Sequence, residues 1–227
     1  MKQTKVAGSN IEAAADKETR VGQLIERLEE LYPQAGCELE HRDPFQLLIA
    51  VVLSAQTTDK SVNQVTPELF QEYPDAASLA AADVNKVEDI LRRIGMYRTK
   101  AARIIQLADR LEKDHQGRVP GRMEQLIKLP GIGRKSANVV LAEVFGEQRI
   151  AVDTHVFRLA RRLGLADQPT PEKTELELME VLPEKRWTFL HHALIHHGRQ
   201  VCMARKPNCA GCGLQELCPK TGVQITD

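Results

Sequence analysis

Four cysteines near the C-terminus place the strongest constraint on how this chain can fold. Cys202, Cys209, Cys212 and Cys218 follow the spacing C-x6-C-x2-C-x5-C. Such dense, unequal spacing wraps a metal centre more readily than it forms disulfides, and the composition otherwise looks intracellular. Zinc and an iron–sulfur cluster both take a tetrahedral set of thiolates. Zinc sites usually contain two short C-x2–4-C pairs, and only Cys209–Cys212 is such a pair, so the pattern favours a 4Fe-4S cluster.

A glycine turn that leads into a helix is the second constraint. Gly131 and Gly133 lie in the sequence LPGIG, and the run Arg134–Phe145 then repeats apolar residues at helical spacing. A turn of this kind exposes backbone N–H groups at the positive end of a helix and predicts an anion site, here for a nucleic-acid phosphate. Lys135 on the first turn and Asp153 beyond the helix could face one cleft. The alternative is a buried glycine corner with Lys135 in solvent.

Three stretches together resemble a known enzyme family. Leu129–Val140, the run VDTHVFRLARRLG at Val152–Gly164 and the cysteine spacing resemble endonuclease III, the bifunctional DNA glycosylase/AP lyase of the helix-hairpin-helix base-excision repair family. The resemblance extends from about residue 21 to residue 218. It implies a 4Fe-4S cluster on the four cysteines and double-stranded DNA with damaged bases or AP sites as the partner.

The resemblance implies that Lys135 and Asp153 are the catalytic residues. Lys135 would attack C1′ of a damaged nucleotide and release the base, and β-elimination from the resulting imine would cut the strand 3′ to the lesion. The amine must be neutral part of the time, which Arg134 and the helix N-terminus both favour. Asp153 would stabilise the oxocarbenium-like sugar. Thr154 and His155 are candidate caps of the next helix, Val156–Leu163, and Asp153 is a third.

Charge is distributed unevenly along a chain whose net charge is zero. Residues 1–90 carry eight Lys and Arg against sixteen Asp and Glu, and residues 91–136 carry twelve against four. The basic segment ends on the glycine turn and predicts a surface that attracts the phosphate backbone. A solvated helix face is the alternative. No apolar run is long enough to span a bilayer, so we expect no membrane partner and a cytoplasmic, nucleoid-associated protein.

The apolar periodicity predicts an all-α fold without strands. Asp43-Pro44 predicts the start of an apolar, buried helix, and Asp59 is expected to cap a later one. The expected helices are Val21–Leu31, Phe45–Leu53, Lys60–Gln71, Ala76–Ala81, Val84–Arg92, Thr99–Lys113, Met123–Ile127, Arg134–Phe145 and Val156–Leu163.

Two turns in this series are candidates for insertion into DNA. Enzymes that extract a base must fill the hole it leaves, often with apolar and amide side chains. In the family that the chain resembles, the matching loops offer Gln56 and a residue at Met96, where leucine is common. Ordinary packing is the alternative for Met96. The predicted DNA contacts are Gln56, Met96, Gly131, Gly133 and Arg134, together with Arg205 and Lys206 of the cysteine loop.

Two further features have structural interpretations. The run His191-His192-Ala193-Leu194-Ile195-His196-His197 places His192 and His196 four residues apart on a helix, as in some zinc sites. No third ligand stands nearby in a recognisable motif, so we expect a structural role. Cys37 is isolated and is expected to fill apolar space.

The sequence therefore predicts two helical domains on either side of a DNA-binding cleft. Residues 1–17 form a disordered tail, residues 37–147 a six-helix barrel with a helix-hairpin-helix at about 123–145, and residues 18–36 with 148–227 the iron–sulfur domain. The resemblance implies a monomer that removes oxidised pyrimidines. Two other functions stay open, namely a monofunctional glycosylase, such as a mismatch enzyme, and a non-catalytic iron–sulfur DNA-binding module.

Overall fold

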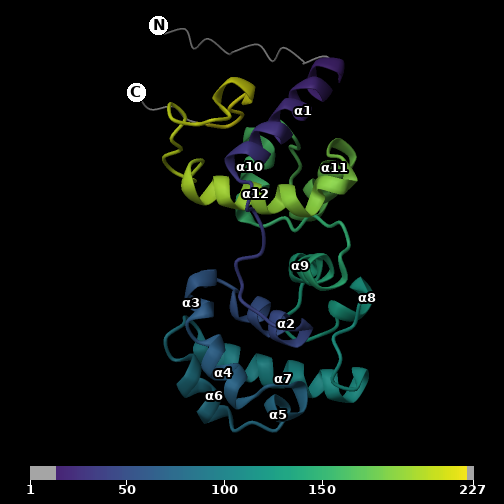
Figure 1. The fold of residues 1–227 in the computed structure, drawn as a ribbon, viewed down its shortest axis with the longest axis vertical. Coiled ribbons are helices and arrows are strands. Elements are labelled where there is room, and N and C mark those ends of the chain that lie inside the picture. Colours follow the sequence, from purple (N-terminus) through teal and green to yellow (C-terminus); the bar gives the residue numbers. More distant parts are fainter. Residues whose placement is uncertain (1–13, 224–227) are drawn as a thin grey trace, which may run out of the picture.

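The computed structural model describes residues 14–223, in which every regular element is a helix. Figure 1 shows two lobes joined by two connecting segments, residues 32–43 between α1 and α2 and residues 146–153 between α9 and α10. The barrel lobe contains α2 (Pro44–Leu53), α3 (Asp59–Asn63), α4 (Thr66–Glu72), α5 (Ala76–Ala80), α6 (Val84–Leu91), α7 (Tyr97–His115), α8 (Met123–Leu126) and α9 (Arg134–Phe145). The cysteine lobe contains α1 (Ala14–Leu31), α10 (Thr154–Arg162), α11 (Pro171–Val181), η1 (Glu184–Arg186), α12 (Trp187–Gln200) and η2 (Gln215–Leu217). The all-α prediction is confirmed.

Helix α2 lies at the centre of the barrel lobe. The Asp43 side chain accepts a hydrogen bond from Gln46 N at 2.9 Å, and Pro44 occupies the first turn, so the helix begins where the sequence predicts. Phe45 and all side chains from Leu47 to Leu53 are buried, and they share one core with α4 to α9. Polar groups would be costly in such a position, which explains why α2 is apolar on every face.

The cysteine lobe has a core of its own, and one extended segment contacts both cores. Leu24 and Leu28 of α1 pack there with residues of α10, α11 and α12. In the segment between α9 and α10, Ile150 and Val152 belong to this core, whereas Ala151 belongs to the core of the barrel lobe. Alternate residues of an extended chain point to opposite sides, so this short segment is held by both lobes.

Three sequence predictions require correction. The disordered tail predicted for residues 1–17 overlaps α1, which begins at Ala14 and has Asp16 in its first turn; the prediction for residues 1–13 lies outside the described part. The helix predicted for residues 60–71 is two helices, α3 and α4, because Pro67 lacks the N–H that would continue the hydrogen-bond ladder. Thr58, not Asp59, caps α3, and its Oγ1 accepts from Ser61 N.

Helix α11 was not among the predicted helices, although its start carries a recognisable signal. Thr170 accepts a hydrogen bond from Lys173 N, and Pro171 follows in the first turn.

Among the described residues, no helix has both the length and the apolar character needed to cross a membrane.

The single tryptophan offers a test of how far the lobes unfold separately. Trp187 is packed against the core of the cysteine lobe, and its indole N–H donates to Leu182 O at 2.9 Å. Because the barrel lobe has the larger core, we expect the Trp187 emission to change at a lower urea concentration than the far-UV circular dichroism. A Trp187→Phe variant should keep the dichroism transition and lose the emission change. Coincident transitions in the wild-type chain would mean that the lobes unfold together.

Candidate active site

The turn between α8 and α9 needs glycine at Gly131. The residue has φ +84°, and a Cβ built there would lie 2.5 Å from Arg103 Cδ and 3.2 Å from Val52 Cγ1. Both the left-handed backbone and the close approach of these side chains exclude a larger residue. Gly133, with extended backbone, is the N-cap of α9 and offers no side-chain cap. The first N–H groups of this helix are therefore free to bind an anion.

Lys135 is an exposed residue on the first turn of α9. Its neighbour Arg134 points to the cysteine lobe, where Nε and Nη2 donate to the two carboxylate oxygens of Glu175 at 2.9 and 2.7 Å. Glu175 lies on α11 and is buried, so this bidentate ion pair compensates a charge that would otherwise be costly. Hydrogen bonding to Glu175 raises the pKa of the Arg134 guanidinium. Arg134 is thus an interlobe contact, a role that the sequence did not indicate.

Asp153 is the N-cap of α10. Its Oδ1 accepts hydrogen bonds from the backbone N–H groups of His155 and Val156, each at 2.8 Å. Neither Thr154 nor His155 caps this helix, because Asp153 alone precedes it with extended backbone and a suitable acceptor. No hydrogen bond within the described residues uses Oδ2. The carboxylate can therefore cap α10 and also face a ligand.

Lys135 and Asp153 line the same cavity at the junction of the lobes. Its walls come from residues 36–39, the end of α2, the start of α3, α9 and α12, and it encloses about 510 Å³ with its open mouth included. The structure thus brings together the two residues to which the sequence analysis assigned the chemistry.

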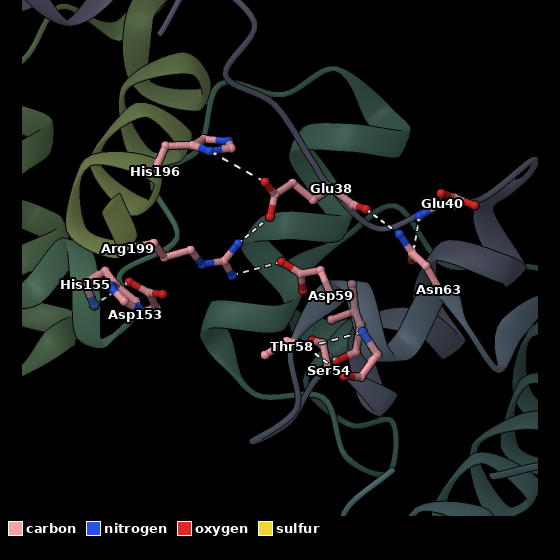
Figure 2. Close-up of polar contacts among 12 residues, drawn as sticks. Glu38, Glu40, Ser54, Thr58, Asp59, Asn63, Asp153, His155, His196 and Arg199 are labelled. Carbon is pink, nitrogen blue, oxygen red and sulfur yellow. Dashed lines mark hydrogen bonds and ion pairs between the residues drawn. The ribbon is translucent and has the colours of Figure 1, made fainter. Parts of the chain in front are cut away.

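Charged side chains from three segments meet beside this cavity, as Figure 2 shows. Arg199 of α12 donates from Nη2 to Asp59 Oδ2 of α3 at 2.9 Å. Its Nη1 donates to the carboxylate of Glu38, which lies in the segment between α1 and α2. His196 Nδ1 lies 3.5 Å from the same Glu38 carboxylate. These contacts join the two lobes at the edge of the cavity. Sequence reasoning missed Glu38 and Arg199, because partners so far apart in the chain leave no local pattern.

Buried histidines and Cys37 form another part of the wall. His192 Nε2 lies 2.8 Å from Glu143 Oε1 of α9. Burial, then the neighbouring His192, lowers the pKa of His191 well below its usual value. Burial raises the pKa of the Cys37 thiol to about 11, and Cys37 packs against the core of the barrel lobe as the sequence analysis expected. These contacts are compatible with the structural role predicted for the histidine run.

The two predicted insertion residues lie on separate exposed turns. Gln56 follows α2 with φ 54°, and Met96 precedes α7 with φ 56° and is 50% exposed. Left-handed backbone is uncommon for residues other than glycine, and it concentrates at functional sites. Gln56 also lines a groove that runs past Asp59 and Arg199 to His155 on the cysteine lobe. Arg205 and Lys206 are exposed on the loop that follows α12.

The four cysteines line a second, small cavity, together with Arg162, His197 and residues of the loop. No three candidate ligands in the described part of the chain have the arrangement expected around a single metal ion. All four cysteines nevertheless line this one cavity, a geometry that fits a multi-atom cluster. Cys212 Sγ and Cys218 Sγ each accept a backbone N–H, from Leu214 and Lys220, at 3.4 Å. Such donors favour thiolates, so the residues present fit an iron–sulfur cluster.

Two arginines of α10 hold the cysteine loop. Arg162 donates to Met203 O and Ala204 O at 2.8 Å and to Cys202 Sγ at 3.3 Å. Arg158 donates to Cys202 O at 3.0 Å and to Gly198 O at 3.0 Å. The sequence analysis missed both residues, because an arginine on a helix ordinarily indicates a solvated surface.

Arg162 provides a test of this anchoring. We expect Arg162→Met to lower the iron and sulfide content per chain, since three charge-assisted bonds, each worth about 1.5–3 kcal/mol, are lost. Arg161→Met is the matched control, because Arg161 is exposed and its one ion pair within residues 14–223 is with Asp167 at 3.0 Å. Iron content and limited proteolysis of the loop are the measurements. A variant with the wild-type iron content and an equally resistant loop would contradict the assigned role.

Comparison with known proteins identifies the same two regions. Residues 49–184 match the family model of the HhH-GPD superfamily of base excision DNA repair proteins, and residues 202–218 match the iron–sulfur binding domain of endonuclease III. The chain is 46% identical to endonuclease III of Synechocystis sp. over 206 residues, which cover 90% of this chain and 94% of that protein.

Solved structures extend this similarity to the fold. A non-covalent endonuclease III–DNA complex matches with a TM-score of 0.85 and 42% identity, covering 89% of this chain and 95% of that one. A trapped endonuclease III–DNA covalent intermediate matches with the same score and identity, covering 89% and 96%.

Proposed function

We propose that this chain, which belongs to the HhH-GPD superfamily of base excision DNA repair proteins and within it to the endonuclease III family, uses Lys135 as its nucleophile and Asp153 as its catalytic carboxylate. The activity of the chain is that of a DNA glycosylase and AP lyase in base excision repair, and it carries an iron–sulfur cluster. The observation that supports the residue roles is that Lys135 and Asp153 line one cavity between the lobes.

The chemistry begins at the Lys135 amine. The Nζ lone pair forms a bond to C1′ of the damaged nucleotide, and the glycosidic bond breaks, with its electron pair and a proton leaving on the base. The sugar ring then opens to an imine between Lys135 and C1′. Loss of the C2′ proton expels the 3′ phosphate by β-elimination, and water hydrolyses the imine to regenerate Lys135. The covalent intermediate of the similar structure supports this route.

Asp153 acts on the sugar as positive charge develops there. Its Oδ1 is occupied by the two N–H groups of α10, whereas Oδ2 is left for the reacting centre. A fixed carboxylate at this place stabilises an oxocarbenium-like sugar without reorganising during the reaction. The helix start holds the carboxylate in position, so capping and catalysis use different oxygens.

The DNA lies along the face where both lobes meet. The free N–H groups at the start of α9, with Gly131 and Gly133, bind a phosphate, and the third guanidinium nitrogen of Arg134 can add a contact. Gln56 and Met96 enter the duplex when the base leaves it. Arg205 and Lys206 extend the positive surface to the cysteine loop. For the domain boundaries we keep the division proposed from the sequence, with residues 37–147 as the barrel domain and residues 18–36 with 148–227 as the iron–sulfur domain.

Oxidised pyrimidines in duplex DNA are the proposed lesions, and the protein acts as a cytoplasmic, nucleoid-associated monomer. The family resemblance supports this substrate class. A monofunctional glycosylase would release the base without forming a covalent adduct. A non-catalytic DNA-binding module would bind the lesion without any release. Both alternatives are outcomes of the following experiment.

Borohydride trapping on duplex DNA that carries an oxidised pyrimidine tests the role of Lys135. We expect a covalent adduct with the wild-type chain and none with Lys135→Gln, because the amide cannot form an imine. Lys128→Gln is the matched control, since Lys128 is an exposed lysine in the segment between α8 and α9, and it should trap normally. An adduct with Lys135→Gln would assign the nucleophile to another amine. Base release without trapping in the wild-type chain would identify a monofunctional enzyme.

Asp153→Asn separates the two roles of the carboxylate. Asparagine is as good an N-cap as aspartate, so the thermal midpoint should change little. The loss of charge should slow base release by about 10²–10³-fold, the usual effect of removing one group that stabilises a transition state. Single-turnover kinetics and thermal unfolding of the cluster-loaded protein are the measurements. Unchanged base release with an intact fold would exclude a catalytic role for the Asp153 charge.

A further inference from the structure

Lys100 is a buried cation that the proposed chemistry does not use. It lies on the first turn of α7, and only 2% of its surface is exposed. Desolvation lowers the pKa of its ammonium group. No ion pair joins Lys100 to a carboxylate in the described part of the chain, and the side chain makes one hydrogen bond, from Nζ to Thr57 Oγ1. Buried charges are rare without a counter-ion, so this arrangement requires an explanation.

The position of Lys100 between two turns supplies that explanation. Its ammonium group bonds Thr57, the residue next to Gln56, and its backbone N–H donates to Met96 O at 3.0 Å. Gln56 and Met96 are both exposed and both have left-handed backbone. Such conformations persist only where the surrounding structure determines them. The Met96 bond is the first backbone bond of α7, so the Lys100 side chain ties the Gln56 turn to the first turn of the helix that begins at Met96.

We propose that Lys100 is a positioning residue that fixes the Gln56 turn to the Met96 turn, so that both side chains enter the DNA duplex in one concerted geometry. This inference rests on the proposed function, because it assigns both turns to the step that removes the base from the stack. A lysine suits the task because its long side chain reaches from α7 to the turn after α2, and its ammonium group donates to the Thr57 hydroxyl.

The experiment measures the protein variants Lys100→Met and Thr57→Val on two DNA substrates. Duplex DNA with an oxidised pyrimidine needs base extraction, whereas a single strand with an AP site has neither a damaged base to extract nor an opposing strand. Misplaced groups cost up to about 100-fold in rate, and we expect each variant to slow single-turnover base release from the duplex by about 10–100-fold. Borohydride trapping on the single strand should proceed at the wild-type rate.

Matched variants distinguish positioning from general damage to the fold. Lys113→Met changes an exposed lysine of the same helix, which pairs with Asp109 at 2.8 Å, and should have no effect. Thr57→Ser retains the hydroxyl and should keep the wild-type rate. If the two residues act through one bond, the double variant Lys100→Met with Thr57→Val should be no slower than the slower single variant.

Each outcome decides between explanations. Equal losses on both DNA substrates, or additive losses in the double variant, would overturn the proposal. A wild-type rate of base release with Thr57→Val would also overturn the proposal. Because Thr57 is only half-buried, this variant provides the test if Lys100→Met does not fold. Failure of the wild-type chain to form an adduct on either substrate would instead overturn the proposed function.

Discussion

A segment of three residues determines how the two lobes meet. Ile150 and Val152 are buried in one core and Ala151 in the other, so the segment cannot shift without disturbing both. The buried Asn138 of α9 fixes it further, because its Nδ2 donates to Ile150 O at 3.0 Å. Asp153 follows directly. The position of the Asp153 carboxylate relative to Lys135 is therefore set by hydrophobic packing on two sides and not by flexible loops.

Two helix starts then supply the groups that act. Helix α9 begins at a glycine and leaves its N–H groups free, whereas α10 begins at Asp153 and has two of them satisfied. The first arrangement receives an anion from outside, and the second holds an anion of the protein in place. The Arg134–Glu175 ion pair joins the start of α9 to the cysteine lobe, so the two helix starts keep a fixed separation.

Local signals in the sequence account for most of the fold, whereas the choice of Lys135 and Asp153 as catalytic candidates also needed the family resemblance. Asp43-Pro44, the glycine turn and the cysteine spacing act over a few residues, and each could be interpreted without the structure. The break between α3 and α4 needed closer attention to Pro67. The partners of Arg134, Arg162 and Arg199 could not be predicted, because each lies far along the chain and contacts of this kind depend on the packed lobes. Nothing in the local sequence indicates that Lys100 is buried.

Helix α10 connects the two centres of the molecule. Asp153 caps its first turn, and Arg158 and Arg162 hold the cysteine loop further along. The helix has nine residues, so it is about 14 Å long. One short helix therefore supports the proposed catalytic carboxylate at its first turn and the cysteine loop at its last, so a substitution that displaces α10 would disturb both sites at once.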